Sequence, residues 1–107
     1  MQTLFSVKHE DGVRLVGASN GDDDYLLWQQ DDTDPKTVHF EYNDQLNSGY
    51  GAIEECTVDS DGCHIVLIDG KMLHFYWHPP RHRDLDLFVR GLVSIYGPDG
   101  AVLQDLR

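Results

Sequence analysis

The sequence predicts an α+β domain: an antiparallel β-sheet of about six to seven strands with one C-terminal α-helix packed on it. Three observations lead to this prediction. Short segments of alternating apolar and polar residues fill the first three quarters of the chain, polar turns separate them, and one segment of helical periodicity follows. A chain of 107 residues fits one domain, so we assign residues 1–107 to a single domain.

Tight turns set the limits of the predicted strands. The pairs Asp11-Gly12 and Asp69-Gly70 are strong hairpin signals, and the Asp-Ser-Asp-Gly segment at 59–62 is a third turn. Alternation places Val38, Phe40 and Tyr42 on the core side of one strand, because side chains two residues apart share a face. Seven strands are expected, at residues 3–8, 13–18, 25–30, 37–43, 52–58, 63–68 and 71–77. In the second, Val13 and Leu15 share a face, and in the last, Leu73, Phe75 and Trp77 do.

The helix is predicted from apolar residues that recur at three- and four-residue spacing from Leu85 to Tyr96. Asp84 is the expected N-cap residue, and Gly97 is the expected first residue beyond the C-terminal end. A helix of about three turns is not stable alone, so we expect it to pack on the sheet. Residues 101–106 either add a short strand or fray.

The charge is large and unevenly distributed. The formal net charge is −11, and residues 1–61 contain fourteen acidic residues against three basic ones, whereas residues 62–107 contain five of each. Nucleic acids and anionic membranes are therefore not expected partners, because both require basic protein surface. A basic protein is the natural partner, and a surface that only keeps the protein soluble is the alternative.

The chain shows no secretory leader and no apolar stretch of the ~20 residues that a membrane helix needs, so we expect a cytoplasmic protein. In that compartment Cys56 and Cys63 stay reduced, and two packed thiols are expected. A bridge across the hairpin is the alternative.

No sequence motif for a nucleophile, a phosphate-binding loop or a dinucleotide site occurs, so we predict that the protein is not an enzyme and needs no cofactor. His74 and His78 would lie about 13 Å apart along one strand, too far to share a zinc ion. The acidic runs 22–24 and 31–34 lack the spacing of a calcium-binding loop, which leaves only weak cation binding open. We therefore predict no metal site.

The most distinctive segment is 39–53, with the sequence HFEYNDQLNSGYGAI. It resembles the immunity protein 10 family of bacterial polymorphic-toxin systems, whose members have a strand ending in an aromatic residue and glutamate, an Asp-Gln-x-Asn-Ser segment, and then Tyr-Gly-Gly-Ile. Ala52 stands where the family has the second glycine. The resemblance extends over residues 13–97. The matching residues are Glu41, Asp44, Gln45, Asn47, Tyr50 and Gly51, and the alternative is that they only shape a turn.

The resemblance implies a protein that binds and neutralises a cognate toxin domain. Many secreted toxins are basic, so an acidic surface would steer the two proteins together. The aromatic anchors would be Tyr25 or Trp28. The predicted partner-binding residues are Asp22, Asp23, Asp24, Tyr25, Trp28, Asp31, Asp32, Asp34, Glu41, Asp44 and Gln45.

Two other functions remain open. One is a small metal-dependent hydrolase that uses His39, Glu41 and Asp44. The other is a ligand-binding module whose pocket lies between the sheet and the helix, lined by Tyr76 and Trp77.

Overall fold

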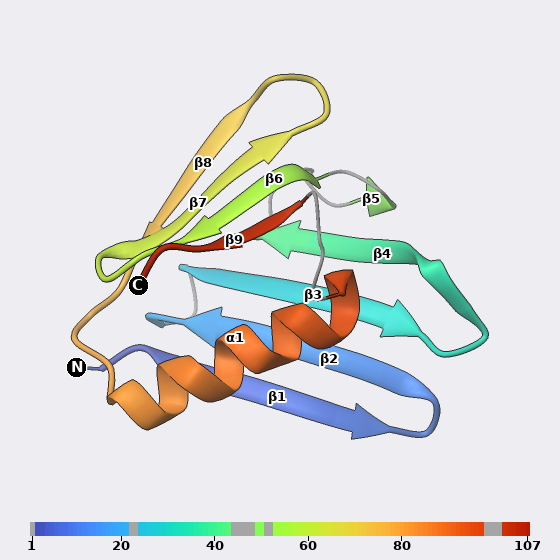
Figure 1. Ribbon diagram of the computed structural model, residues 1–107, viewed down its shortest axis with the longest axis horizontal. Helices are drawn as coiled ribbons and strands as arrows, with labels where there is room; N and C mark the ends of the chain where they lie inside the picture. Colours follow the sequence, from blue (N-terminus) through green and yellow to red (C-terminus); the bar gives the residue numbers. More distant parts are fainter. Residues whose placement is uncertain (1, 22–23, 44–48, 51–52, 98–101) are drawn as a thin grey trace.

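Two β-sheets and one α-helix surround one cluster of buried side chains in the computed structural model, which describes residues 2–21, 24–43, 49–50, 53–97 and 102–107 (Figure 1). The first sheet is antiparallel and has the order β1 (Leu4–Glu10), β2 (Val13–Ser19), β3 (Tyr25–Asp31), β4 (Asp34–Tyr42) and β5 (Gly49–Tyr50). The second has the order β8 (Met72–Tyr76), β7 (Gly62–Leu67), β6 (Ile53–Val58) and β9 (Leu103–Asp105). The helix, α1 (His82–Tyr96), lies between β8 and β9 in sequence.

The α+β class and the single C-terminal helix are confirmed for the part of the chain described, but the strands form two sheets instead of one. The physical reason is coverage. A helix is about 10–12 Å wide and strands are about 4.8 Å apart, so one helix covers only two or three strands. Helix α1 packs on β1 and β2. The second sheet covers the strands of the first sheet that the helix leaves uncovered, and Ile53 of β6 lies beside Val38 and Phe40 of β4.

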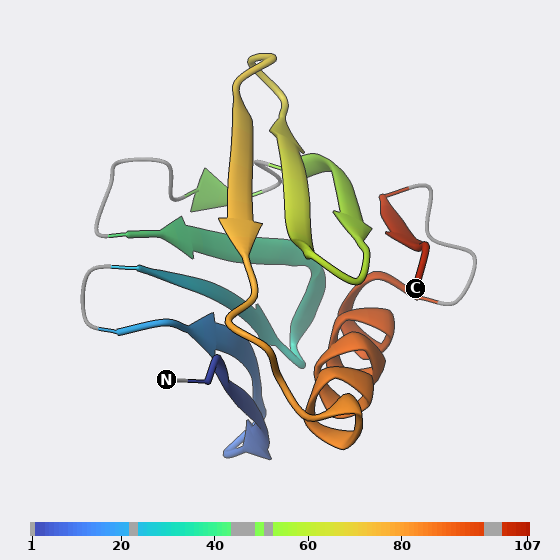
Figure 2. The same ribbon diagram turned by 90° about the vertical axis from the view of Figure 1, so that its left-hand side faces the viewer.

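The helix and the second sheet lie on the same side of the first sheet (Figure 2). The aromatic centre of the core lies between them. Phe88 of α1 is fully buried, with its ring centroid 5.8 Å from that of Trp28 and 5.6 Å from that of Trp77. Trp28 also contacts Phe40, at 5.1 Å. Phe88 therefore links the helix to the first sheet and to Trp77, the residue that directly follows β8.

Two predicted core faces are confirmed. Phe40 is buried, with Val38 and Tyr42 packed against the core, and Leu73, Phe75 and Trp77 are all buried. In β2 the buried side chains are Val16 and Ala18, so the face shared by Val13 and Leu15 is the outward one.

The helix begins two residues before the predicted cap. Arg81 holds the N-cap position without a side-chain hydrogen bond, so the prediction that Asp84 is the N-cap was wrong. Asp84 lies instead in the first turn, where its negative charge interacts favourably with the helix dipole. Gly97 ends the helix as predicted: its φ is +85°, and its N–H donates to the Val93 carbonyl at 2.7 Å. The tail forms β9, which pairs parallel to β6.

Two hairpins differ in their turns. Asp11 and Gly12 both have positive φ, which matches the two-residue turn expected at that position. The loop between β7 and β8 is longer: the Leu67 N–H donates to the Lys71 carbonyl at 2.8 Å, and Gly70 adopts φ +88°. This geometry is that of a three-residue loop whose last residue takes the left-handed conformation.

Gly62 is required at the start of β7. A Cβ atom at this position would lie 2.1 Å from the Phe75 carbonyl oxygen of the neighbouring strand. We therefore expect Gly62→Ala to lower the free energy of unfolding by at least about 2 kcal/mol, measured by urea denaturation. Ser60→Ala, an exposed change in the same turn, is the matched control and should stay within about 0.5 kcal/mol of the unmodified protein. Equal stability of the two variants would contradict the close approach.

Candidate functional site

The side of the first sheet that faces away from α1 and the second sheet carries side chains that are half-buried or exposed. We call this surface the open face. Its apolar centre comprises Leu15 of β2 and Leu27 of β3, which are half-buried. Polar groups surround that centre. The outward side chains of β3 and β4 are Tyr25, Leu27, Gln29, Asp31, Thr37, His39 and Glu41.

A shallow concavity of about 680 Å³ lies on the open face at the β3–β4 turn. Its lining is polar and includes two of the predicted partner-binding carboxylates, those of Asp31 and Asp34. The residues that line it are Gln29, Asp31, Thr33, Asp34, Thr37 and His39.

The Asp31 carboxylate is held in place by its own turn. One of its oxygens accepts hydrogen bonds from the Thr33 N–H at 2.9 Å and the Thr33 hydroxyl at 2.7 Å. These bonds to the charged form lower the pKa of Asp31 below its ordinary value of 3.8. The concavity therefore presents a fixed negative charge at neutral pH.

Other predicted acidic residues lie around the same sheet. Glu41 accepts a hydrogen bond from the Tyr25 hydroxyl, which orients both groups on the open face. Asp32 pairs with His9 at 2.8 Å at the same end of the sheet as the concavity. Asp24 accepts a hydrogen bond from the Asn20 amide at the opposite end. Of the predicted acidic residues that the structure describes, Asp31, Asp32 and Asp34 lie at one end of β3, and Asp24 and Glu41 lie toward the other.

One predicted anchor is not at the surface. Trp28 is fully buried against Phe40 and Phe88, because it belongs to the inward face of β3, so its assignment to partner binding was wrong. Tyr25, three residues away on the outward side at the end of β3, is half-buried. Of the family motif, Tyr50 lies in β5, where its backbone is in register with His39. The predicted residues Asp22, Asp23, Asp44, Gln45, Asn47 and Gly51 lie outside the described residues.

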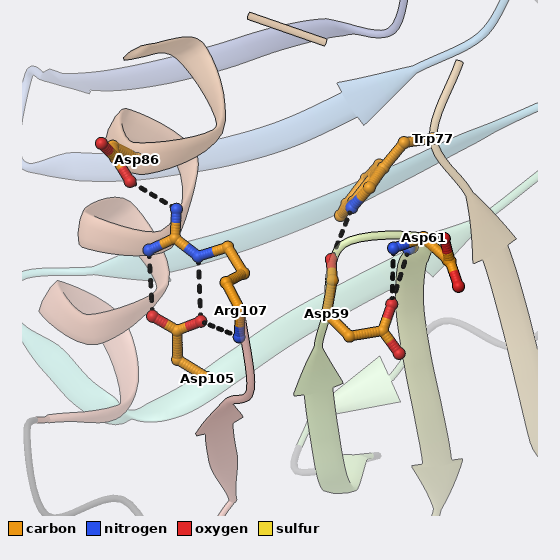
Figure 3. Close-up of polar contacts among 7 residues, drawn as sticks. Asp59, Asp61, Trp77, Asp86, Asp105 and Arg107 are labelled. Atoms are coloured by element: carbon orange, nitrogen blue, oxygen red, sulfur yellow. Dashed lines mark hydrogen bonds and ion pairs between the residues drawn. The ribbon is translucent and has the colours of Figure 1, made fainter. Parts of the chain in front are cut away.

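A second cavity, of about 700 Å³, lies between the β6–β7 turn, the start of α1 and the strand β9. Trp77, Pro79, Pro80 and Leu85 supply its apolar wall. The Trp77 indole donates to the Asp59 carbonyl at 3.1 Å, which fixes the ring at the cavity edge (Figure 3). Of the two residues expected to line the pocket of a ligand-binding module, Trp77 lines this cavity and Tyr76 does not.

Arg107 forms one wall of this second cavity and was not identified from the sequence. Its guanidinium contacts Asp86 of α1 and Asp105 of β9 (Figure 3). The guanidinium hydrogen bonds lower the pKa of Asp105 and outweigh the opposing effect of its partial burial. A single side chain therefore joins the helix to the edge strand of the second sheet.

The two cysteines are packed thiols. Both are buried, and their sulfur atoms lie 3.5 Å apart on β6 and β7. The hydrogen bond with Cys56, together with burial, raises the pKa of the Cys63 thiol, so it stays protonated and unreactive.

Within the described ranges no three histidine, cysteine, aspartate or glutamate side chains come together as metal ligands would. Two histidines nevertheless meet: the Nδ1 atoms of His64 and His74 lie 2.5 Å apart. Of the described segments, none forms a helix long and apolar enough to cross a membrane.

The Arg107 contacts allow a test by pH. Asp105 has a lowered pKa when folded, so its ionised form stabilises the folded state above pH 3.8, and this contribution disappears as the pH falls through the lowered pKa. Arg107→Ala should therefore lower the free energy of unfolding at pH 7 by up to about 1 kcal/mol, and the difference should vanish in acid. Urea denaturation at both pH values measures it. Arg90→Ala, an exposed arginine on α1, is the control, and a loss of equal size there would contradict the assignment.

Comparison with known proteins gives no relative: no protein-family model, no curated protein and no solved structure matches this chain.

Proposed function

We propose that this protein is a bacterial immunity protein that binds a basic toxin domain through its open face and thereby neutralises it. The observation that carries the proposal is the concavity on that face, where Asp31 and Asp34 present carboxylates to solvent. The resemblance of segment 39–53 to the immunity protein 10 family supports it independently. That segment includes Glu41 on the open face and the edge strand β5 beside it.

The arrangement of the face suits a protein partner. Leu15 and Leu27 give an apolar centre, Tyr25 adds an aromatic ring, and carboxylates stand at the margin. Protein interfaces commonly combine an apolar centre with a polar rim, and tyrosine is enriched at their most important contacts. The hydrogen bonds to Asp31 and Glu41 reduce the entropy that these side chains would lose on binding.

The charge distribution favours a basic partner. The excess of acidic residues lies in residues 1–61, which include all five strands of the first sheet. A basic protein is attracted to such a surface, whereas nucleic acids and anionic membranes are repelled. The proposal places the protein in the cytoplasm, where it meets the toxin before secretion.

Charge reversal on the open face tests the proposal. We expect Asp31→Lys combined with Asp34→Lys to slow association with the toxin domain encoded by the adjacent gene by about tenfold or more, and to weaken the dependence of that rate on salt. Stopped-flow kinetics at several salt concentrations provides the measurement. Co-expression of the same variant should protect cells from the toxin less well.

The matched control is Glu54→Lys combined with Glu55→Lys, which changes the net charge equally on exposed residues of β6 in the second sheet. This control should slow association much less. If both double variants slowed it equally, net charge and not the open face would govern binding. If neither did, the open face would be dismissed as the interface.

A small-ligand-binding function is the second candidate, favoured by the cavity at Trp77. Its apolar wall and the Asp61 and Arg107 side chains suit a small molecule with both apolar and charged groups. Native mass spectrometry of the purified protein should then show an added mass, and Trp77→Phe with Leu85→Ala should reduce it. Unmodified mass in every preparation would remove this candidate.

A further inference from the structure

A pair of histidines lies on the outward face of the second sheet, on the opposite side of that sheet from the core. His64 of β7 and His74 of β8 are directly opposite one another in the strand register. Their Nδ1 atoms are 2.5 Å apart, and the two ring planes meet at 76°. His74 is exposed, and the His64 side chain is about one third exposed, so solvent ions reach both rings.

A carboxylate fixes the orientation of one ring. The Nε2 atom of His64 lies 3.1 Å from a carboxylate oxygen of Asp59. The other oxygen of Asp59 accepts hydrogen bonds from the N–H groups of Asp61 and Gly62, at 2.8 and 2.9 Å. These bonds hold the Asp59 carboxylate beside His64, so a neutral His64 that donates to it carries its proton on Nε2. This leaves the lone pair of His64 Nδ1 directed at His74.

We propose that His64 and His74 together bind a divalent transition-metal ion, such as Zn²⁺ or Cu²⁺, through their Nδ1 atoms. Imidazole nitrogen is a preferred ligand for these ions. A histidine ligand commonly donates its other N–H to a carboxylate, the relation that Asp59 has to His64. Water molecules complete the coordination, as is usual where a protein supplies only part of the ligand set.

The required adjustment is small. Zinc–nitrogen bonds of 2.0–2.1 Å at a tetrahedral angle place two ligand nitrogens about 3.3 Å apart, so the two Nδ1 atoms move apart by about 0.8 Å and the rings turn until both lone pairs point at the metal. Neither ring is locked in the core, and the Tyr76 ring lies beside both, at centroid distances of 6.2 and 6.3 Å. With the His64 proton on Nε2, the Nδ1–H group of His74 donates the hydrogen bond to Nδ1 of His64 in the free protein. On metal binding that proton moves to His74 Nε2, and two neutral rings release no net proton.

Isothermal titration of the full chain with zinc chloride at pH 7 tests the proposal. We expect His64→Gln and His74→Gln each to weaken zinc binding by about tenfold or more, and Asp59→Asn by about 10–100-fold. His78→Gln, which removes an exposed histidine at another position, should leave binding unchanged. Nitrogen-15 NMR of the imidazole rings should show zinc on Nδ1 of both rings, a signature that a merely structural histidine pair does not give.

Magnesium chloride is the control for general attraction to the acidic surface, because magnesium prefers oxygen ligands. No zinc binding at millimolar concentration would overturn the proposal and leave the two rings as an ordinary hydrogen-bonded pair. Equal losses in His78→Gln and His74→Gln, or magnesium binding as tight as zinc, would also overturn it. Both rings lie on the second sheet, so these results are independent of binding at the open face.

Discussion

The contact of Phe88 with Trp28 and Trp77 is the interaction on which the architecture depends, because it holds the helix against the first sheet and against the end of the last strand of the second sheet at once. One helix covers only part of a five-stranded sheet, so the remaining inward side chains need a second layer. The second sheet provides this layer, with Phe75 of β8 and Trp77, the residue that directly follows β8, both buried. As a consequence, each sheet keeps one outward face: the first carries the concavity with Asp31 and Asp34, and the second carries the His64–His74 pair.

Much of the local structure could be predicted from the sequence, because alternation and turn residues are local signals. The seven long strands and the helix lie close to their expected positions, and Phe40 and Phe75 face the core as expected. Alternation defines two faces of a strand but not which of them is covered. Trp28 was therefore wrongly assigned to the surface, because the residues that cover it, Phe40 and Phe88, lie far away in sequence. The division into two sheets was missed for the same reason, since it depends on coverage and not on any single segment.

The histidine pair shows how much depends on one loop residue. A two-residue turn at Asp69-Gly70 would place His64 opposite Phe75, which would set an outward ring against an inward one. Gly70 adopts a left-handed conformation that lengthens the loop by one residue, and His64 then lies opposite His74. The pairing could have been deduced from the sequence by requiring both strands to bury their apolar sides. Comparing histidines along one strand, as for His74 and His78, could not reveal it. The carboxylates of the open face, in contrast, follow directly from the strand ends.

The parallel pairing of β9 with β6 has a consequence for biosynthesis. The strand β9 comes after the helix in sequence, yet it completes a sheet whose other three strands precede the helix. During translation, β6 therefore remains an unpaired edge while β7, β8 and α1 emerge from the ribosome. Such an edge is a template for pairing with another chain. The nascent protein thus passes through a stage at which this edge is open to pairing with another chain, and the stage ends when β9 pairs with β6.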